Sequence, residues 1–262
     1  MITGSHNPPN YNGFKMVLGG AAIYGEQIQS LRKQIEGEHF HQGTGQRSTF
    51  NIFPQYLKYI VGDVRLARPM KIAVDCGNGV GGAFAGELFR ALGCDVQELF
   101  CEVDGNFPNH HPDPAHLENL QDLIRNLAST DNELGLAFDG DADRLGVVTK
   151  DGQVIFPDRQ MMLFAKDVLS RNPGGQIIYD VKCTRNLAVY IKKYGGDPEK
   201  IILCGHSAGG HLVSLVTCDP TYFKTEKVNP SSIKGVISIS GVYEIPAIIL
   251  GNVFGNTPEK KV

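Results

Sequence analysis

The chain has 262 residues, of which 42% are apolar and 20% charged, and its formal net charge is −3. This balance is typical of globular proteins. The negative charge argues against a nucleic-acid or membrane-surface role, because both of those partners are anionic. No stretch approaches the roughly 18 apolar residues that a membrane span needs, and the amino end lacks the layout of a signal peptide. We therefore expect a cytoplasmic protein with no nucleic-acid partner and no membrane partner.

The amino-terminal segment presents a serine on a turn. Residues 3–15 read Thr-Gly-Ser-His-Asn-Pro-Pro-Asn-Tyr-Asn-Gly-Phe-Lys. Glycine, asparagine and proline favour turns, so Ser5 is expected on a loop with His6 beside it and Lys15 further along. A hydroxyl placed in this way is available for chemistry.

Apolar spacing then alternates between helical and strand-like stretches. In chain order it predicts helices over 28–35 and 53–64, a strand over 71–75, a helix over 84–92, a strand over 96–100, a helix over 117–127 and a strand over 134–138. Repeats of strand, helix and strand imply right-handed crossovers. The predicted fold class is therefore α/β, with mostly parallel sheets and helices on both faces. A tight hairpin over 147–156 is expected to add strands locally in antiparallel fashion.

Three aspartates follow the predicted strand over 134–138. Asp139, Asp141 and Asp143 occupy alternate positions on a loop, where their carboxylates can converge on one hard cation such as Mg²⁺. The loop is not an EF-hand, because its sixth and twelfth positions lack the required Gly and Glu. A solvated acidic turn is the alternative. Arg144 favours the metal site, because a guanidinium beside a cation suits a phosphorylated substrate.

A cation loop together with a presented serine suggests phosphoryl transfer. Residues 1–194 also resemble the α-D-phosphohexomutases, in particular the bacterial phosphomannomutase/phosphoglucomutase branch. The stretches that carry the resemblance, in the family's order, are 3–8, 75–79, 104–114, 139–144 and 180–185.

The resemblance implies a specific chemistry. The serine that matches Ser5 carries a phosphate, donates it to a hexose 1- or 6-phosphate such as that of mannose or glucose, and takes it back from the other end of a bisphosphorylated intermediate. The implied ligands of Mg²⁺ are an oxygen of the phosphoserine and the aspartates Asp139, Asp141 and Asp143.

The resemblance also assigns the remaining roles. Ser5, His6 and Lys15 are the implied catalytic residues, with the lysine as a candidate general acid or base. Arg144, Lys182 and His206 are the implied substrate-binding residues. Taken singly, the lysines are equally consistent with surface charges, and His6 with a side chain that satisfies a loop carbonyl.

A glycine-rich turn offers a different class of function. Residues 77–82 satisfy the pattern G-x-G-x-x-G between a predicted strand and helix, as in dinucleotide-binding modules. Asp75 disfavours this interpretation, because its carboxylate would lie close to a bound pyrophosphate. The phosphohexomutase resemblance explains the same glycines as a tight turn against a closely packed helix.

Residues 195–262 resemble a second family, the esterase and kynurenine-formamidase-like branch of the α/β-hydrolases. Residues 205–209 read Gly-His-Ser-Ala-Gly after a predicted strand, which is the pattern of a nucleophile elbow with Ser207 as nucleophile. The later strand over 234–241 fits the same fragment. After Ser207, however, His211 is the only histidine, and its place on the elbow helix does not suit the catalytic base. A serine hydrolase fragment is therefore the alternative function, with Ser207 more consistent with an idle serine than with a working nucleophile.

The predicted organisation is a mosaic of partial phosphohexomutase domains and a partial α/β-hydrolase core. Its parts are a remnant of domain 1 with the serine loop (1–51), domain 2 with the metal loop (52–153), the start of domain 3 (154–194) and the hydrolase-like fragment (195–262). Because positioning supplies much of phosphoryl-transfer catalysis, we expect the incomplete set of domains to impair turnover. A non-catalytic product that exposes sheet edges is a third possibility.

Overall fold

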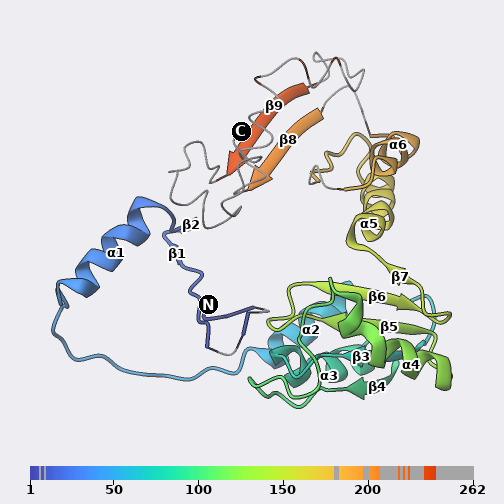
Figure 1. Ribbon diagram of the computed structural model, residues 1–262, viewed down its shortest axis with the longest axis horizontal. Coiled ribbons are helices and arrows are strands. Elements are labelled where there is room, and N and C mark those ends of the chain that lie inside the picture. Colours follow the sequence, from blue (N-terminus) through green and yellow to red (C-terminus); the bar gives the residue numbers. More distant parts are fainter. Residues whose placement is uncertain are drawn as a thin grey trace, which may run out of the picture. The chain divides into compact units, whose positions relative to one another are not determined.

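The computed structural model of the chain describes residues 1–5, 7–8, 10–179, 183–196, 201–206, 218, 221, 224 and 233–239. It divides into two compact units, Met1–Pro157 and Asp158–Val262 (Figure 1). The first unit holds a five-stranded sheet and the amino-terminal region, and the described residues of the second form two helices and a pair of strands.

The five strands of the first unit form a mixed sheet. They are β3 (Lys71–Asp75), β4 (Asp95–Leu99), β5 (Leu134–Phe138), β6 (Leu145–Thr149) and β7 (Val154–Ile155), in the order β4-β3-β5-β6-β7. Strand β3 pairs in parallel with β4 and β5, whereas β6 pairs antiparallel with both β5 and β7. The α/β class is confirmed, but a mostly parallel sheet is wrong. The loop between β5 and β6 is too short for a parallel crossover, which needs about a dozen residues or more.

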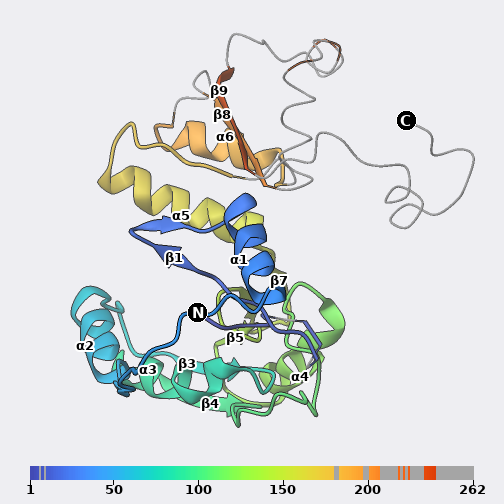
Figure 2. The same ribbon diagram turned by 90° about the vertical axis from the view of Figure 1, so that its left-hand side faces the viewer.

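Helices cover both faces of this sheet, as Figures 1 and 2 show. Successive side chains of a strand point to opposite faces, so β3 divides the core in two. On one face Ile72 and Val74 pack in a cluster with Ala85 of α3 (Ala85–Ala91). On the other face Ala73 packs with buried leucines of α4 (Gln121–Ser129). Two short 3₁₀ helices, η1 (Val80–Ala83) and η2 (Leu117–Leu120), precede α3 and α4. This core fixes the strand ends from which the candidate site is built.

The amino-terminal region has a different character. It contains the two-residue strands β1 (Val17–Leu18) and β2 (Ala21–Ala22), the helix α1 (Glu26–Glu36) and an isolated antiparallel bridge between Ile2 and Phe14. The helix α2 (Phe53–Asp63) follows. Both helices were expected from their apolar spacing, but neither contains a buried residue. None of the described residues among 1–51 is buried, so this region has no core of its own.

The second unit contains α5 (Pro157–Arg171) and α6 (Asn186–Lys193), whose buried contacts join Ala165 and Leu169 to Leu187 and Ile191. Its strands β8 (Ile201–His206) and β9 (Ile233–Ile239) pair in parallel. They correspond to the two strands expected on either side of the elbow sequence. No helix in the described ranges is long and apolar enough to cross a membrane.

Candidate metal and serine site

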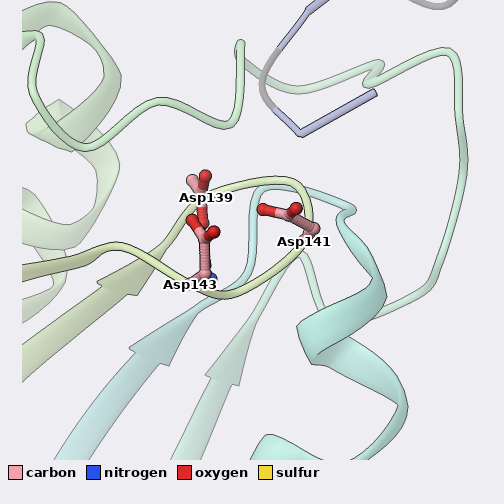
Figure 3. A group of neighbouring side chains, drawn as sticks. All are labelled: Asp139, Asp141 and Asp143. Atoms are coloured by element: carbon pink, nitrogen blue, oxygen red, sulfur yellow. Dashed lines mark hydrogen bonds between the residues drawn. The ribbon is translucent and has the colours of Figure 1, made fainter. Parts of the chain in front are cut away.

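The three predicted aspartates lie together on the loop between β5 and β6 (Figure 3). One ligand oxygen from each of Asp139, Asp141 and Asp143 lies within 4.8 Å of the others. Asp139 is fully buried, Asp141 is partly buried and Asp143 is exposed. The loop is shaped by Asp139, whose Oδ1 accepts the backbone N–H groups of Asp143 and Arg144 at 3.0 Å each. The second oxygen of Asp139 remains directed at the cluster.

The serine loop meets this aspartate loop. The Oγ of Ser5 lies 3.1 Å from Oδ2 of Asp139 and 3.2 Å from Oδ1 of Asp141, although Ser5 and Asp139 are 134 residues apart in the chain. Gly140 permits the approach, because a Cβ at that position would lie 2.0 Å from the carbonyl oxygen of Ser5. Ser5 itself has a φ of 52°, in the left-handed region that few non-glycine residues adopt. The two loops therefore fit together through close backbone contact and shared polar groups.

Thr3 is a member of the site that the sequence analysis missed. Its Oγ1 accepts the backbone N–H of Ser5 at 2.8 Å and donates to Oδ2 of Asp141 at 2.8 Å. The signal that could have found it is the position two residues before Ser5, where a Thr hydroxyl commonly accepts the following turn's N–H. Thr3 supports the left-handed backbone of Ser5 and joins it to the cluster.

Two cationic side chains predicted for the site lie beside the carboxylates. The Nζ of Lys15 is 3.2 Å from Oδ2 of Asp143 and 3.5 Å from Oδ2 of Asp141. The hydrogen bond to Asp143, with the charges of both carboxylates, raises the pKa of Lys15 above its usual value. The Nε of Arg144 lies 3.9 Å from Oδ2 of Asp139, and its side chain is about half exposed. Both cations can therefore reach an anion bound over the cluster.

The surroundings of the aspartates shift their pKa values in different directions, and at Asp139 they disfavour the charged carboxylate that a cation would stabilise. Burial, reinforced by the charges of Asp141 and Asp143, raises the pKa of Asp139 although the Arg144 N–H opposes this. Burial alone would also raise the pKa of Asp141, but hydrogen bonds from Thr3 and Ser5 and the charge of Lys15 outweigh it and leave that pKa below its usual value. An all-oxygen donor set with one deeply buried carboxylate suits Mg²⁺. The residues present therefore fit the metal that the sequence suggests.

The glycine-rich turn over residues 77–82 packs directly against the backbone of the aspartate loop. The N–H of Val80 donates to the carbonyl of Gly140 at 3.0 Å, and the N–H of Asn78 donates to the carbonyl of Phe100 at 2.7 Å. A Cβ at Gly79 would lie 2.9 Å from the Cα of Gly140, so the two backbones are in close contact. Because these N–H groups already have protein acceptors, they are poorly placed to cradle a pyrophosphate. The turn favours a structural role over a dinucleotide site.

A buried ion pair lies at the base of the same turn, and the sequence analysis missed it too. The side chain of Asp75 is fully inaccessible, accepts the N–H of Gly77 at 2.9 Å and lies 3.2 Å from Nε2 of His110. The Nδ1 of His110 is 3.0 Å from the carbonyl of His111. Since both ring nitrogens face acceptors, only the doubly protonated ring can donate to both. Burial opposes this charge, but the Asp75 carboxylate and the His111 carbonyl outweigh burial and raise the pKa of His110.

The remaining predicted residues are not placed at this site. His6, Lys182 and Ser207 lie outside the described residues. His206 is the last residue of β8, and its side chain lies outside the described part of the chain. The described site therefore consists of Ser5, Lys15, Arg144 and the three aspartates, with Thr3 added.

Three models of known protein families match parts of this chain. The family model "Phosphoglucomutase/phosphomannomutase, alpha/beta/alpha domain II" matches residues 54–152, and the model of domain I matches residues 1–42. A further model, "Carboxylesterase family", matches residues 185–258. The first two matches contain the aspartate loop and the serine loop, respectively.

Individual relatives align over the same part of the chain. The chain is 64% identical over 198 residues to a phosphoglucomutase of Neisseria meningitidis, which covers 75% of this chain and 43% of the relative. It is 59% identical over 198 residues to a phosphomannomutase/phosphoglucomutase of Pseudomonas aeruginosa, with 76% and 43% covered. A crystal structure of a phosphoglucomutase/phosphomannomutase family protein from Burkholderia thailandensis superimposes with a TM-score of 0.71 at 65% identity and covers 75% of this chain and 43% of that one.

These matches define the class as an α/β protein with phosphohexomutase domains. The part of the chain that they cover belongs to the phosphoglucomutase/phosphomannomutase family. The chain spans less than half the length of these relatives.

Proposed function

We propose that the Ser5 and aspartate loops form the phosphoserine and Mg²⁺ site of a phosphohexomutase of the phosphomannomutase/phosphoglucomutase type. The substrates would be 1- and 6-phosphates of mannose or glucose. The observation that carries the proposal is the position of the Ser5 Oγ, within hydrogen-bond reach of both Asp139 and Asp141. Two carboxylates at a serine that carries a phosphate would repel that phosphate unless a cation offset their charge.

The proposal assigns the cation's ligands and its role. Asp139, Asp141 and Asp143 would hold Mg²⁺ together with an oxygen of the phosphorylated Ser5. When bound, the cation would neutralise the negative charge that the phosphate brings to the carboxylates and stabilise the phosphoryl group during transfer.

The chain's own side chains would then bind the phosphate and move a proton. Lys15 is protonated in this environment because Asp143 and Asp141 raise its pKa, so it would act first as the acid that protonates the Ser5 oxygen as the phosphoryl group leaves. Arg144 would hold phosphate oxygens from its half-exposed position beside Asp139. By family resemblance, His6 would assist at the serine, and Lys182 and His206 would contact the sugar phosphate.

We also propose that this chain turns over hexose phosphates poorly on its own. The serine loop belongs to a region in which no described residue is buried, and its contacts with the aspartate loop are mainly polar. Loss of positioning at the nucleophile slows phosphoryl transfer strongly. A single phosphoryl transfer from a bisphosphorylated hexose to Ser5 is therefore expected to be easier to detect than repeated turnover.

A phosphorylation experiment tests the proposal. The purified chain is incubated with glucose 1,6-bisphosphate with and without Mg²⁺, and phosphopeptides are identified by mass spectrometry. We expect phosphate on Ser5 that requires Mg²⁺, is absent from Ser5→Ala and Asp139→Asn, and persists in the exposed control Ser48→Ala. A coupled assay from glucose 1-phosphate to glucose 6-phosphate then measures turnover. Phosphate transfer that is independent of Ser5 or of Asp139 would contradict the proposal.

A second candidate function concerns the carboxyl-terminal part of the chain. Two observations favour it: the carboxylesterase family match to residues 185–258 and the parallel pairing of β8 with β9, with Ser207 directly after β8. We propose residues 195–262 as an α/β-hydrolase-like fragment joined to the phosphohexomutase part. If its serine is active, hydrolysis of p-nitrophenyl acetate should be lost in Ser207→Ala and retained in Ser5→Ala. Equal hydrolysis by the chain and by Ser207→Ala would exclude it.

A further inference from the structure

The hydroxyl of Thr3 has a fixed hydrogen-bond direction. The backbone N–H of Ser5 can only donate, so Oγ1 of Thr3 accepts at that contact of 2.8 Å. The single hydroxyl proton is then free to be donated, and Oδ2 of Asp141 lies 2.8 Å away. Thr3 therefore accepts a hydrogen bond from the Ser5 backbone and donates one to Oδ2 of Asp141, and these two roles cannot be exchanged.

The two oxygens of Asp141 consequently have different surroundings. Oδ2 accepts from Thr3 and lies 3.5 Å from Nζ of Lys15. Oδ1 lies 3.2 Å from Oγ of Ser5, on the side that Ser5 shares with Asp139. The Asp141 side chain is only 4% exposed, so water has little access to replace a lost donor. Thr3 and Lys15 thus hold one oxygen and leave the other for the cluster.

The two oxygens of Asp139 also have different hydrogen-bond partners. Its Oδ1 is held by the backbone N–H groups of Asp143 and Arg144, and its Oδ2 faces Ser5. Two of the three carboxylates are therefore arranged to offer a single oxygen each. At Asp139 the backbone imposes this arrangement, whereas at Asp141 a replaceable side chain does.

We propose that Thr3 determines the metal selectivity of the site by keeping Asp141 a one-oxygen ligand, which favours Mg²⁺ over Ca²⁺. The inference rests on the proposed function, because it takes the aspartate cluster as a cation site. Mg²⁺ demands near-octahedral geometry at about 2.1 Å, whereas Ca²⁺ accepts about 6 to 8 oxygens at longer distances and readily takes both oxygens of one carboxylate. Releasing Oδ2 lets Asp141 rotate and offer both oxygens, which helps Ca²⁺ and not Mg²⁺.

The test compares two variants of the full chain that differ by one hydroxyl. Thr3→Val removes the hydroxyl and keeps the side-chain shape, whereas Thr3→Ser keeps the hydroxyl. Dissociation constants of Mg²⁺ and Ca²⁺ are measured by competition against bound Mn²⁺, followed by electron paramagnetic resonance. We expect the selectivity for Mg²⁺ over Ca²⁺ to fall about tenfold in Thr3→Val, the effect of one charge-assisted hydrogen bond. It should stay within about twofold of the parent in Thr3→Ser and in the exposed control Thr44→Val.

The outcomes separate this inference from the function on which it rests. If the parent chain binds neither cation, the metal site fails and the role of Thr3 fails with it. If the parent binds Mg²⁺ and Thr3→Val weakens both cations equally, Thr3 merely supports the loop and the selectivity inference is overturned while the metal site stands. Thr3→Ala provides the same loss of hydroxyl if the valine variant does not fold, and it must show the same change in the ratio.

Discussion

The two halves of the candidate site are stabilised by different means. The aspartate loop connects β5 and β6, strands of a sheet with an apolar cluster on each face. The serine loop belongs to residues 1–51, which include no buried residue in the described part. It is held by the polar contacts of Thr3, Ser5 and Lys15 with the aspartates. The comparison indicates that the aspartate loop is held in place by the folded sheet. The position of the serine loop depends instead on polar contacts with the aspartates, which a bound cation would strengthen.

The largest expected difference between the two regions is the loss of unfolding free energy when an apolar side chain is shortened to alanine. Leu123 of α4 is fully buried against the sheet, so Leu123→Ala should lower the free energy of unfolding by about 2 to 5 kcal/mol. Ile35 of α1 is 62% exposed, and Ile35→Ala should change it by less than about 0.5 kcal/mol. Urea denaturation followed by circular dichroism measures both. Equal effects would show that the amino-terminal region has a core comparable to that of the sheet.

Replacing the buried aspartate should separate stability from metal binding. A raised pKa means that the fold disfavours the ionised form of Asp139, so stability is lost as pH rises from the reference pKa of 3.8 through the higher folded pKa. Asp139→Asn removes that cost, and the metal-free protein should gain about 0.5 to 2 kcal/mol. The parent should gain about 2.7 kcal/mol when Mg²⁺ is present at 100 times its dissociation constant, and the variant should gain nothing.

Thermal melts of both proteins with and without Mg²⁺ provide the measurement for Asp139→Asn. The asparagine keeps an oxygen that can accept the N–H groups of Asp143 and Arg144. A variant that is less stable than the parent without metal would contradict the electrostatic account.

A glycine substitution should move the serine loop away from the aspartates. In Gly140→Ala the new Cβ would lie 2.0 Å from the Ser5 carbonyl oxygen, and the other neighbour, Cγ of Pro112, would be at an ordinary 3.6 Å. The serine loop must shift, so Mg²⁺ affinity should fall about tenfold, the effect of a lost charge-assisted interaction, while the sheet's melting changes little. Calorimetric titration measures the affinity. The control is Gly43→Ala, because a Cβ at that position would have no atom within 4 Å. Equal Mg²⁺ affinities of Gly140→Ala and the parent would mean that the two loops lie further apart than described.

The smallest expected effect is a pH dependence from His110. Its folded pKa is raised above the reference value of 6.5, so the ion pair with Asp75 stabilises the fold fully below that reference pH. This contribution is lost as pH rises through the folded pKa. Between about pH 6 and about pH 8, the stability advantage of the parent over His110→Asn should therefore shrink by about 1 kcal/mol. Denaturation at the two pH values measures it, with exposed His41→Asn as the control, and an advantage that grows with pH would reverse the assignment.

The fold was largely predictable from local patterns. The apolar spacing that predicted helices over 28–35 and 53–64 agrees with α1 and α2, because helical periodicity is a local property. The same spacing could not tell whether an apolar face is covered, and α1 buries none of its residues. The hairpin that pairs β6 with β7 was predicted, but the antiparallel pairing of β6 with β5 was missed. The alternation of strands and helices stops at the aspartate loop, and the short length of that loop, which periodicity does not reveal, decides the strand direction.

The site was predictable in part, and for different reasons. The alternate spacing of Asp139, Asp141 and Asp143 predicts a cation loop from the residues alone. That Ser5 joins this loop followed from family resemblance, since contacts across 134 residues leave no local pattern. Thr3 and the pair of Asp75 with His110 were missed, because their roles depend on which acceptors the fold brings to them.

The most direct test of the central claim, that a cation bound by the aspartates ties the serine loop to the sheet, is hydrogen–deuterium exchange of residues 1–15 with and without Mg²⁺. The account predicts that Mg²⁺ slows exchange at the Ser5 amide, which donates to Thr3, in the parent and not in Asp139→Asn. Exchange in β3 should be slow in both proteins, because its backbone pairs with two neighbouring strands. Exchange of residues 1–15 that does not respond to Mg²⁺ in the parent would contradict the claim.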